Sequence, residues 1–158
     1  MARVFQDFLF NFTWAAVQGW EVKHDRFAWH AESESDPTLA LLPRMEMDVS
    51  LRKGNLHVIV DARYYQSTLS EYYGAPMVHA GSLYQLIRYV GNAERRRDGE
   101  VSGMLAYPRI DRPLREKYAI HGHRLTIYTV DLSRDWSEIR DEMLMALNVC
   151  TRLPKHCP

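Results

Sequence analysis

Residues 44–63, RMEMDVSLRKGNLHVIVDAR, have the clearest secondary-structure pattern in the sequence. Over residues 44–52 apolar and polar side chains alternate strictly, which is the pattern of a β-strand with one buried face. Gly54-Asn55 is a favoured two-residue hairpin turn, and residues 56–62 are rich in β-branched side chains. The stretch therefore predicts two antiparallel strands joined by a tight turn.

The turn also fixes which residues face each other across this hairpin. Asp48 is expected opposite Asp61, and Glu46 opposite Arg63. These four side chains would form a polar patch on one face, while the other face would be wholly apolar. The patch is the strongest candidate site that the pattern offers.

Two opposed carboxylates are costly for a sheet to keep. Opposed side chains on an antiparallel pair lie ~5 Å apart, and two carboxylates at that distance repel by roughly 3 kcal/mol at an effective dielectric of 20. A shared proton or a cation would relieve the repulsion between Asp48 and Asp61, and Mg²⁺ is a cation that takes carboxylate oxygens. The alternative is a solvent-facing pair of strands in which Arg44 and Arg63 neutralise the acids.

The rest of the chain predicts an α/β domain with a mixed sheet. The spacing of apolar residues predicts three helices. The second is expected over residues 82–90 and should stop at Gly91-Asn92. The first is expected to bury Val4, Phe5, Phe8, Leu9 and Phe12, and the third, which follows Asp135, is expected to bury Trp136, Ile139, Met143 and Leu147. Further strands are expected over 27–31, 103–107, 117–120 and 125–130. Loops are expected over 32–43 and 66–78.

The composition fits one globular domain, predicted over residues 1–150, with a frayed tail over 151–158. The 158 residues are 46% hydrophobic, and 20 basic residues balance 20 acidic ones, which argues against a tail-driven polyanion binder. No stretch resembles a signal peptide or a membrane span, and the two cysteines lack zinc-site spacing, so a cytoplasmic location is expected. Because the first helix begins almost at Met1, the sequence is expected to start inside a larger protein.

Several separated segments resemble the PD-(D/E)xK nuclease superfamily and, more narrowly, the nuclease domain of the McrC family. They are LPRMEMDVSL, VIVDARYY, SLYQLIRYV, GMLAYP and YAIHGHRLTIYTVDL, and the resemblance extends from VFQDFLFNF to the last helix. It implies a restriction-endonuclease-like core, a mixed sheet flanked by helices. It further implies a Mg²⁺-dependent endonuclease, with Mn²⁺ as a possible substitute, that cuts double-stranded DNA with a McrB-like AAA+ GTPase in restriction of DNA carrying 5-methylcytosine.

The resemblance also assigns roles to residues of the hairpin. Asp48 and Asp61 match the two metal-binding acids of the family, with the carbonyl of Ala62 as a further ligand. Arg63 stands where the family carries its catalytic lysine. Because arginine stays protonated, it cannot act as a general base. The alternative function is therefore a catalytically weakened or inactive module that acts in DNA binding or complex assembly.

Gln85 and Tyr89 resemble the Gln-x-x-x-Tyr pair of related nucleases, and at i and i+4 they share one helix face. The alternative for this pair is the rim of an amphipathic helix. Gln6 stands in a region where many members of the superfamily place a glutamate. Proteins of the McrC family carry an N-terminal region that engages McrB, and the sequence has no counterpart, which weakens the expectation of that partner.

The remaining candidates are expected to be structural. His121 and His123 flank a turn glycine with no evident acidic partner, so an exposed hairpin tip is favoured over a metal site. The run from Arg95 to Arg97 is expected to be a solvated loop, with phosphate contacts as the alternative.

Overall fold

The computed structural model describes residues 2–65, 70–72, 75–97, 99–110 and 112–150. Within these residues the helices are α1 (Ala2–Ala16), α2 (Ala80–Arg95) and α3 (Trp136–Cys150). The main sheet contains β1 (Glu21–Lys23), β4 (Val49–Lys53), β5 (Leu56–Ala62), β8 (Glu100–Pro108), β9 (Arg115–Ile120) and β10 (His123–Val130). Two small sheets contain β2 (Arg26–Phe27) with β3 (Met45–Glu46), and β6 (Ser70–Tyr72) with β7 (Ala75–Met77).

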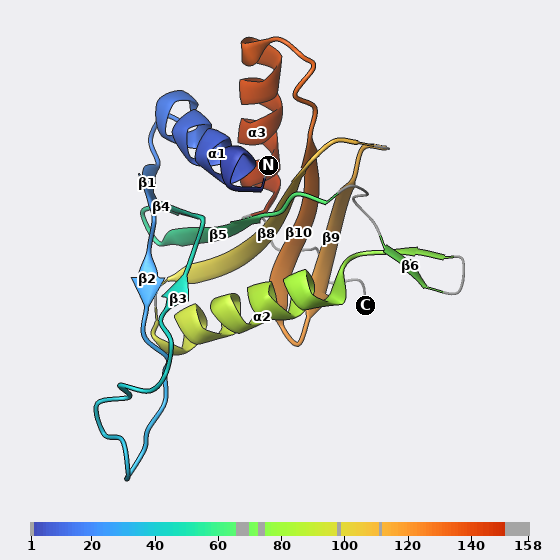
Figure 1. The fold of residues 1–158 in the computed structure, drawn as a ribbon. Helices are drawn as coiled ribbons and strands as arrows, with labels where there is room; N and C mark the ends of the chain where they lie inside the picture. The colour runs from blue at the N-terminus through green and yellow to red at the C-terminus, as the bar shows by residue number, and fades with distance from the viewer. Residues whose placement is uncertain (1, 66–69, 73–74, 98, 111, 151–158) are drawn as a thin grey trace, which may run out of the picture.

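The six strands of the main sheet lie in the order β1-β4-β5-β8-β10-β9. The pairs β5–β8 and β8–β10 are parallel and the other three are antiparallel, so the predicted α/β class with a mixed sheet is confirmed. Helix α2 covers one face, and helices α1 and α3 cover the other (Figure 1). The central strands are therefore buried on both faces, as expected for parallel pairs between helical layers.

The predicted register of the central hairpin is confirmed. Gly54 and Asn55 form the turn, with Gly54 at φ 58°, and Val49 pairs with Val60. A left-handed φ at the first turn position suits the twist of an antiparallel hairpin and costs least for glycine. The ladder from Val49–Val60 to Lys53–Leu56 has the register that this turn predicts.

The first strand of the hairpin is not continuous, which corrects the prediction for residues 44–52. It is broken at residues 47–48, where the backbone amide of Met47 bonds to the carbonyl of Asp25 instead. Met45 and Met47 pack in the core on the α2 side, whereas Val49 and Leu51 pack on the α1/α3 side. The pairing expected between Glu46 and Arg63 is wrong, because Glu46 lies opposite Arg26 of β2 and forms an ion pair with it at 3.1 Å. An alternating pattern cannot reveal a change of partner strand.

The second helix continues past the glycine at which it was expected to stop. Asn92 is buried in the helix, where its side-chain amide donates to the carbonyl of Ala28 and its side-chain oxygen accepts from the amide of His30. These two bonds connect α2 to the segment after β2. The predicted strand over 27–31 shrinks to β2, whose two residues end at Phe27.

The other elements lie largely where the sequence predicts them. The 117–120 and 125–130 hairpin is confirmed with longer strands, as are the strand over 103–107 and the loop over 32–43. In the first helix Phe5, Leu9 and Phe12 are buried, but Val4 is exposed. In α3 the expected core residues are buried except Trp136, which is 53% exposed and packs one side of its ring against Phe12.

Part of the loop expected over 66–78 is the β6–β7 pair, and residue 78 lies outside helices and strands as predicted. Residues 66–69 and 73–74, like the tail over 151–158, lie outside the described residues. None of the helices in the described part of the chain is long and apolar enough to span a membrane.

Helix α2 packs closely on the sheet at Gly103 of β8, and a substitution there tests this packing. A Cβ added there would lie 2.8 Å from Cγ2 of Val90 and 2.9 Å from Cδ1 of Leu86, and both side chains are fully buried, so a shift of either would disturb the packing around it. We expect Gly103→Ala to lower the free energy of unfolding by about 1–3 kcal/mol in urea denaturation. Gly81→Ala at the start of α2, where a Cβ meets no atom within 4 Å, is the matched control and should leave stability equal or slightly higher. A Gly103→Ala variant as stable as the parent would contradict this packing.

Candidate active site

The site lies at the end of the β4–β5 hairpin that is remote from its turn. Asp61 is the second-last residue of β5 and is only 4% exposed, while Asp48 immediately precedes β4 and is half-buried. Their side chains are close enough for each carboxyl group to act on the pKa of the other. The structure therefore brings these two carboxylates close together, although Asp48 lies just outside the β4–β5 ladder, and their role as metal ligands stays a prediction.

The position of Asp48 is fixed by the backbone of the neighbouring strand. Its Oδ2 accepts a hydrogen bond of 2.8 Å from the amide of Ala62. The carboxylate thus takes the place of a backbone carbonyl just beyond the last pair of the β4–β5 ladder. This contact involves the amide of Ala62, so the predicted contribution of the Ala62 carbonyl to a metal site is a separate, untested point.

Arg63 joins the carboxylates to helix α2. Its Nε donates to Oδ2 of Asp61 at 2.7 Å, and its guanidinium also donates to Oε1 of Gln85. Gln85 in turn donates from Nε2 to the hydroxyl of Tyr89 at 2.6 Å. The structure therefore brings the predicted Gln85–Tyr89 pair to the two acids through Arg63, rather than leaving it on a helix rim.

Burial dominates the electrostatics of the site. It raises the pKa of Asp61 to about 6, an effect that Arg63 opposes and the adjacent Asp48 reinforces. Burial also raises the pKa of Asp48, against the hydrogen bond from the Ala62 amide. For Arg63, burial acts to lower the pKa, but the Asp61 carboxylate outweighs it and the pKa is raised, so the guanidinium stays charged. At neutral pH the site thus holds two crowded acids and one permanent cation.

The two carboxylates fit a hard divalent cation. A proton shared between buried acids and a bound cation relieve the same repulsion, and Mg²⁺ commonly takes one or two carboxylates together with water. Within the described residues no group of three His, Cys, Asp or Glu side chains surrounds a common point, so the protein would supply few ligands. Arg63 already occupies Oδ2 of Asp61, so a cation would compete with the guanidinium for that oxygen.

Asp48 is reached from solvent through a cavity of about 360 Å³ between α1 and the β2–β3 region. Besides Asp48, its lining includes Gln6, His24 and Glu46. Glu46, predicted as a member of the polar patch that supports the two acids, therefore lies near Asp48 despite its ion pair with Arg26, and its supporting role stays a prediction. Sequence reasoning missed His24, whose charge acts to lower the pKa of Asp48, because no motif connects it to the hairpin.

The other histidines singled out in the sequence lie away from the two acids. Nδ1 of His123 is 2.7 Å from Oε2 of Glu94, so the expectation that it has no acidic partner is wrong. This contact joins the start of β10 to the end of α2. His121, at the turn of the β9–β10 hairpin, is exposed as predicted.

The sequence matches a known restriction enzyme over most of its length. Over 144 residues, or 91% of this chain, it is 34% identical to the type IV methyl-directed restriction enzyme EcoKMcrBC of Escherichia coli (strain K12). The two proteins are homologous over that region, and the chain spans about two-fifths (41%) of the relative's length. No model of a protein family matches the chain. A match covering 91% of the chain has to include the hairpin and α2, which carry the site.

The raised pKa of Asp61 predicts how stability changes with pH. Its folded-state pKa of about 6 exceeds the ordinary value, so its contribution is fully present below pH 4 and is lost as the pH rises through 6. We expect the metal-free Asp61→Asn variant to match the parent near pH 4 and to exceed it above pH 7 by on the order of 2 kcal/mol. Urea denaturation in EDTA between pH 4 and 8 measures this difference. A difference that does not change with pH would show that Asp61 is not buried as described.

Proposed function

We propose that this chain is the DNA-cleaving domain of a modified-cytosine restriction system of the McrBC type, a Mg²⁺-dependent endodeoxyribonuclease with a PD-(D/E)xK core. The observation that carries the proposal is the placing of Asp48, at the amide of Ala62, beside the buried Asp61 and its permanent cation, Arg63. Homology to a type IV methyl-directed restriction enzyme supports the same reading. The sheet order and the helices on both faces are compatible with such a core.

In this proposal Asp48 and Asp61 hold the divalent ion, with the Ala62 carbonyl as a further ligand. The ion would activate a water molecule and stabilise charge on the phosphoryl group. The amide of Ala62 keeps the Asp48 carboxylate in one orientation at 2.8 Å, so the ligand set is preorganised. Mn²⁺ would serve as a substitute because it accepts the same oxygen ligands.

Arg63 would supply positive charge to the phosphate, where the related nucleases use a lysine. In the structure the guanidinium binds Asp61 and Gln85, so it reaches a phosphate only by sharing or giving up one of these contacts. Gln85 and Tyr89 would position Arg63 and, when it moves, offer polar groups to the substrate. Since Arg63 stays protonated, the proton from the attacking water has to leave by another route.

The substrate in this proposal is double-stranded DNA, and the partner is a McrB-like AAA+ GTPase that delivers the nuclease. The balanced charge of the chain, 20 basic against 20 acidic residues, supports delivery by a partner rather than strong DNA binding by the domain alone.

A second candidate function is a nuclease-fold module that has lost catalysis and acts in DNA binding or assembly. The specific observation in its favour is that Arg63 already neutralises Asp61, with Nε at 2.7 Å from Oδ2. A guanidinium held there both competes with a metal ion and lacks a lysine's ability to lose a proton. The two candidates differ in what one substitution does.

Arg63→Lys decides between them. Lysine is a compact cation that can approach both water and phosphate, so we expect divalent-dependent cleavage of supercoiled plasmid to increase by about one to two orders of magnitude. Cleavage is measured with Mg²⁺ or Mn²⁺, with and without a McrB-type partner and GTP. Arg63→Ala should abolish whatever activity the parent has.

Asp48→Asn in the Arg63→Lys background is the matched control. It should abolish the cleavage expected of the Arg63→Lys protein, because the ion then loses a ligand. If Arg63→Lys remains inert under all these conditions, the endonuclease proposal fails and the module without catalysis is the better account.

A further inference from the structure

Next to the proposed active site is a groove between α2 and the segment that enters β3. Its volume is about 390 Å³. The lining side chains that matter are two cations, two aromatic residues and the polar pair of α2: Arg44, Arg88, Trp29, Tyr84, Gln85 and Tyr89. Gln85 is the residue that accepts a hydrogen bond from Arg63, so the groove opens beside the two acids.

The charge of the groove is positive and uncompensated. Arg44 and Arg88 are both exposed, and no acidic side chain lines the groove. Among the ion pairs formed between described residues, neither arginine takes part. Cations that have no acidic partner remain available to an anionic ligand such as phosphate.

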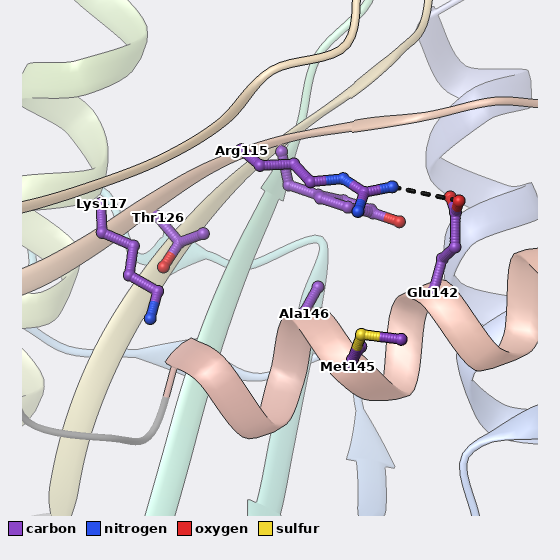
Figure 2. Close-up of a pocket in the computed structure, with 7 residues that line it drawn as sticks. Arg115, Lys117, Thr126, Glu142, Met145 and Ala146 are labelled. Carbon is purple, nitrogen blue, oxygen red and sulfur yellow. Dashed lines mark ion pairs between the residues drawn. The ribbon is translucent and has the colours of Figure 1, made fainter.

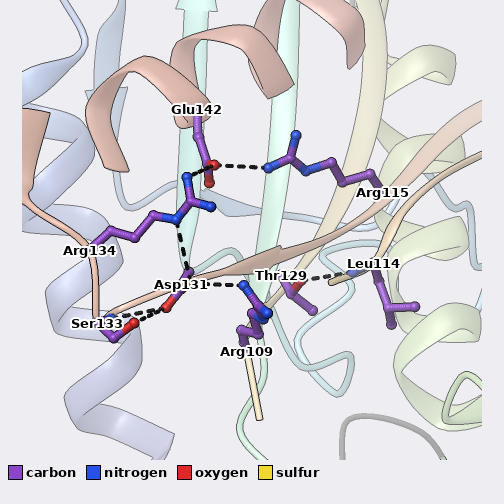
Figure 3. A network of polar contacts seen from close by, with 8 residues as sticks. All are labelled: Arg109, Leu114, Arg115, Thr129, Asp131, Ser133, Arg134 and Glu142. Atoms are coloured by element: carbon purple, nitrogen blue, oxygen red, sulfur yellow. Dashed lines mark hydrogen bonds and ion pairs between the residues drawn. The ribbon is translucent and has the colours of Figure 1, made fainter. Parts of the chain in front are cut away.

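The other arginine-rich surface of the molecule is different. The pocket between β9, β10 and α3 contains Arg115, but this side chain forms an ion pair with Glu142 at 3.0 Å (Figure 2). Beside it, Arg134 binds both Glu142 and Asp131, and Arg109 binds Asp131 (Figure 3). The three arginines there are already paired with acids, whereas Lys117 at the same pocket takes part in no ion pair among the described residues. The groove beside Gln85 combines two exposed cations that have no ion pair among the described residues with access to the proposed site.

The aromatic residues suggest what accompanies the phosphate. Tyr84 is 60% exposed, one turn of helix before Arg88 on the same face of α2. Across the groove, the indole N–H of Trp29 donates to the carbonyl of Pro43 at 2.8 Å, which holds that ring in place. Exposed aromatic rings beside cations are the recurring elements of single-stranded nucleic-acid binding, because each unpaired base has a face that can stack.

We propose that this groove binds an unpaired stretch of DNA next to the cleavage site, with Arg44 and Arg88 on its phosphates and Tyr84 as a stacking platform for a base. The inference rests on the proposed nuclease function and adds the form of the substrate, a locally opened strand, and the path it follows. A strand held along this part of α2 reaches Gln85 and, through it, Arg63 and Asp61.

Binding is measured without cleavage, in EDTA, by fluorescence anisotropy of the full chain with two labelled DNAs. One is a duplex with an unpaired central segment and the other a fully paired duplex of the same length. The parent is expected to bind the DNA with the unpaired segment several-fold more tightly. Arg44→Gln and Arg88→Gln should each weaken that binding about three- to tenfold, and Tyr84→Ala should weaken it about tenfold, whereas Tyr84→Phe should bind like the parent.

Arg140→Gln is the control for loss of one charge, because Arg140 is a partly exposed residue of α3, on the opposite side of the sheet, and its guanidinium pairs with Asp141. It should not change binding, and thermal melting shows that each variant is folded.

Equal affinity for both DNAs, or unchanged binding by the Arg88→Gln and Tyr84→Ala variants, would overturn the proposal that this groove binds unpaired DNA. Weakened binding in these variants together with an inert Arg63→Lys protein would support the groove and reject the nuclease proposal. Cleavage by the Arg63→Lys protein together with unchanged binding in the groove variants would support the nuclease proposal and reject the groove as a DNA-binding site.

Discussion

The hydrogen bond from the amide of Ala62 to Oδ2 of Asp48 is the contact on which the site depends. It lies where the chain leaves its pairing with β2 and begins to pair with β5, so one side chain closes the gap between two sheets. Because Asp48 is held by the backbone of β5, it cannot turn away from Asp61 without leaving a buried amide unpaired. An unpaired buried amide costs about 1–3 kcal/mol, which is comparable to the repulsion that the contact creates.

Arg63 balances this repulsion and at the same time limits what the site can do. Its charge lowers the cost of burying Asp61, and its contact with Gln85 ties the end of β5 to α2. A divalent cation would do the same electrostatic work more fully, but it needs the oxygen that Arg63 holds. The protein therefore has two competing ways to neutralise the same pair of acids, an internal guanidinium and an external ion. If the guanidinium of Arg63 prevails over the ion, the pair of acids holds no metal and the domain cannot cleave DNA by a metal-dependent route. If the ion prevails, such cleavage is open to it.

Features that depend on residues close together in the sequence could be predicted, and features that depend on residues far apart could not. The turn at Gly54 and the register of β4 with β5 were predictable, because both depend on neighbouring residues. The break of the first strand at residues 47–48 could not be predicted, because it depends on the pairing of β3 with β2, about twenty residues earlier in the sequence. In the same way, α2 passes its expected stop because Asn92 finds partners in residues 28–30. For the site, the two acids were predictable from the hairpin, but the contact of Arg63 with Gln85 depends on how α2 packs on the sheet.

The central claim is that Asp48 and Asp61 together form a cation site at the end of the hairpin. Its most direct test is paramagnetic broadening of backbone amide signals by substoichiometric Mn²⁺, recorded by NMR on the parent and on Asp48→Asn. We expect the strongest broadening at Ala62 and its neighbours in the parent, and loss of that broadening in the variant. Broadening centred on another part of the molecule, or left unchanged in Asp48→Asn, would contradict it.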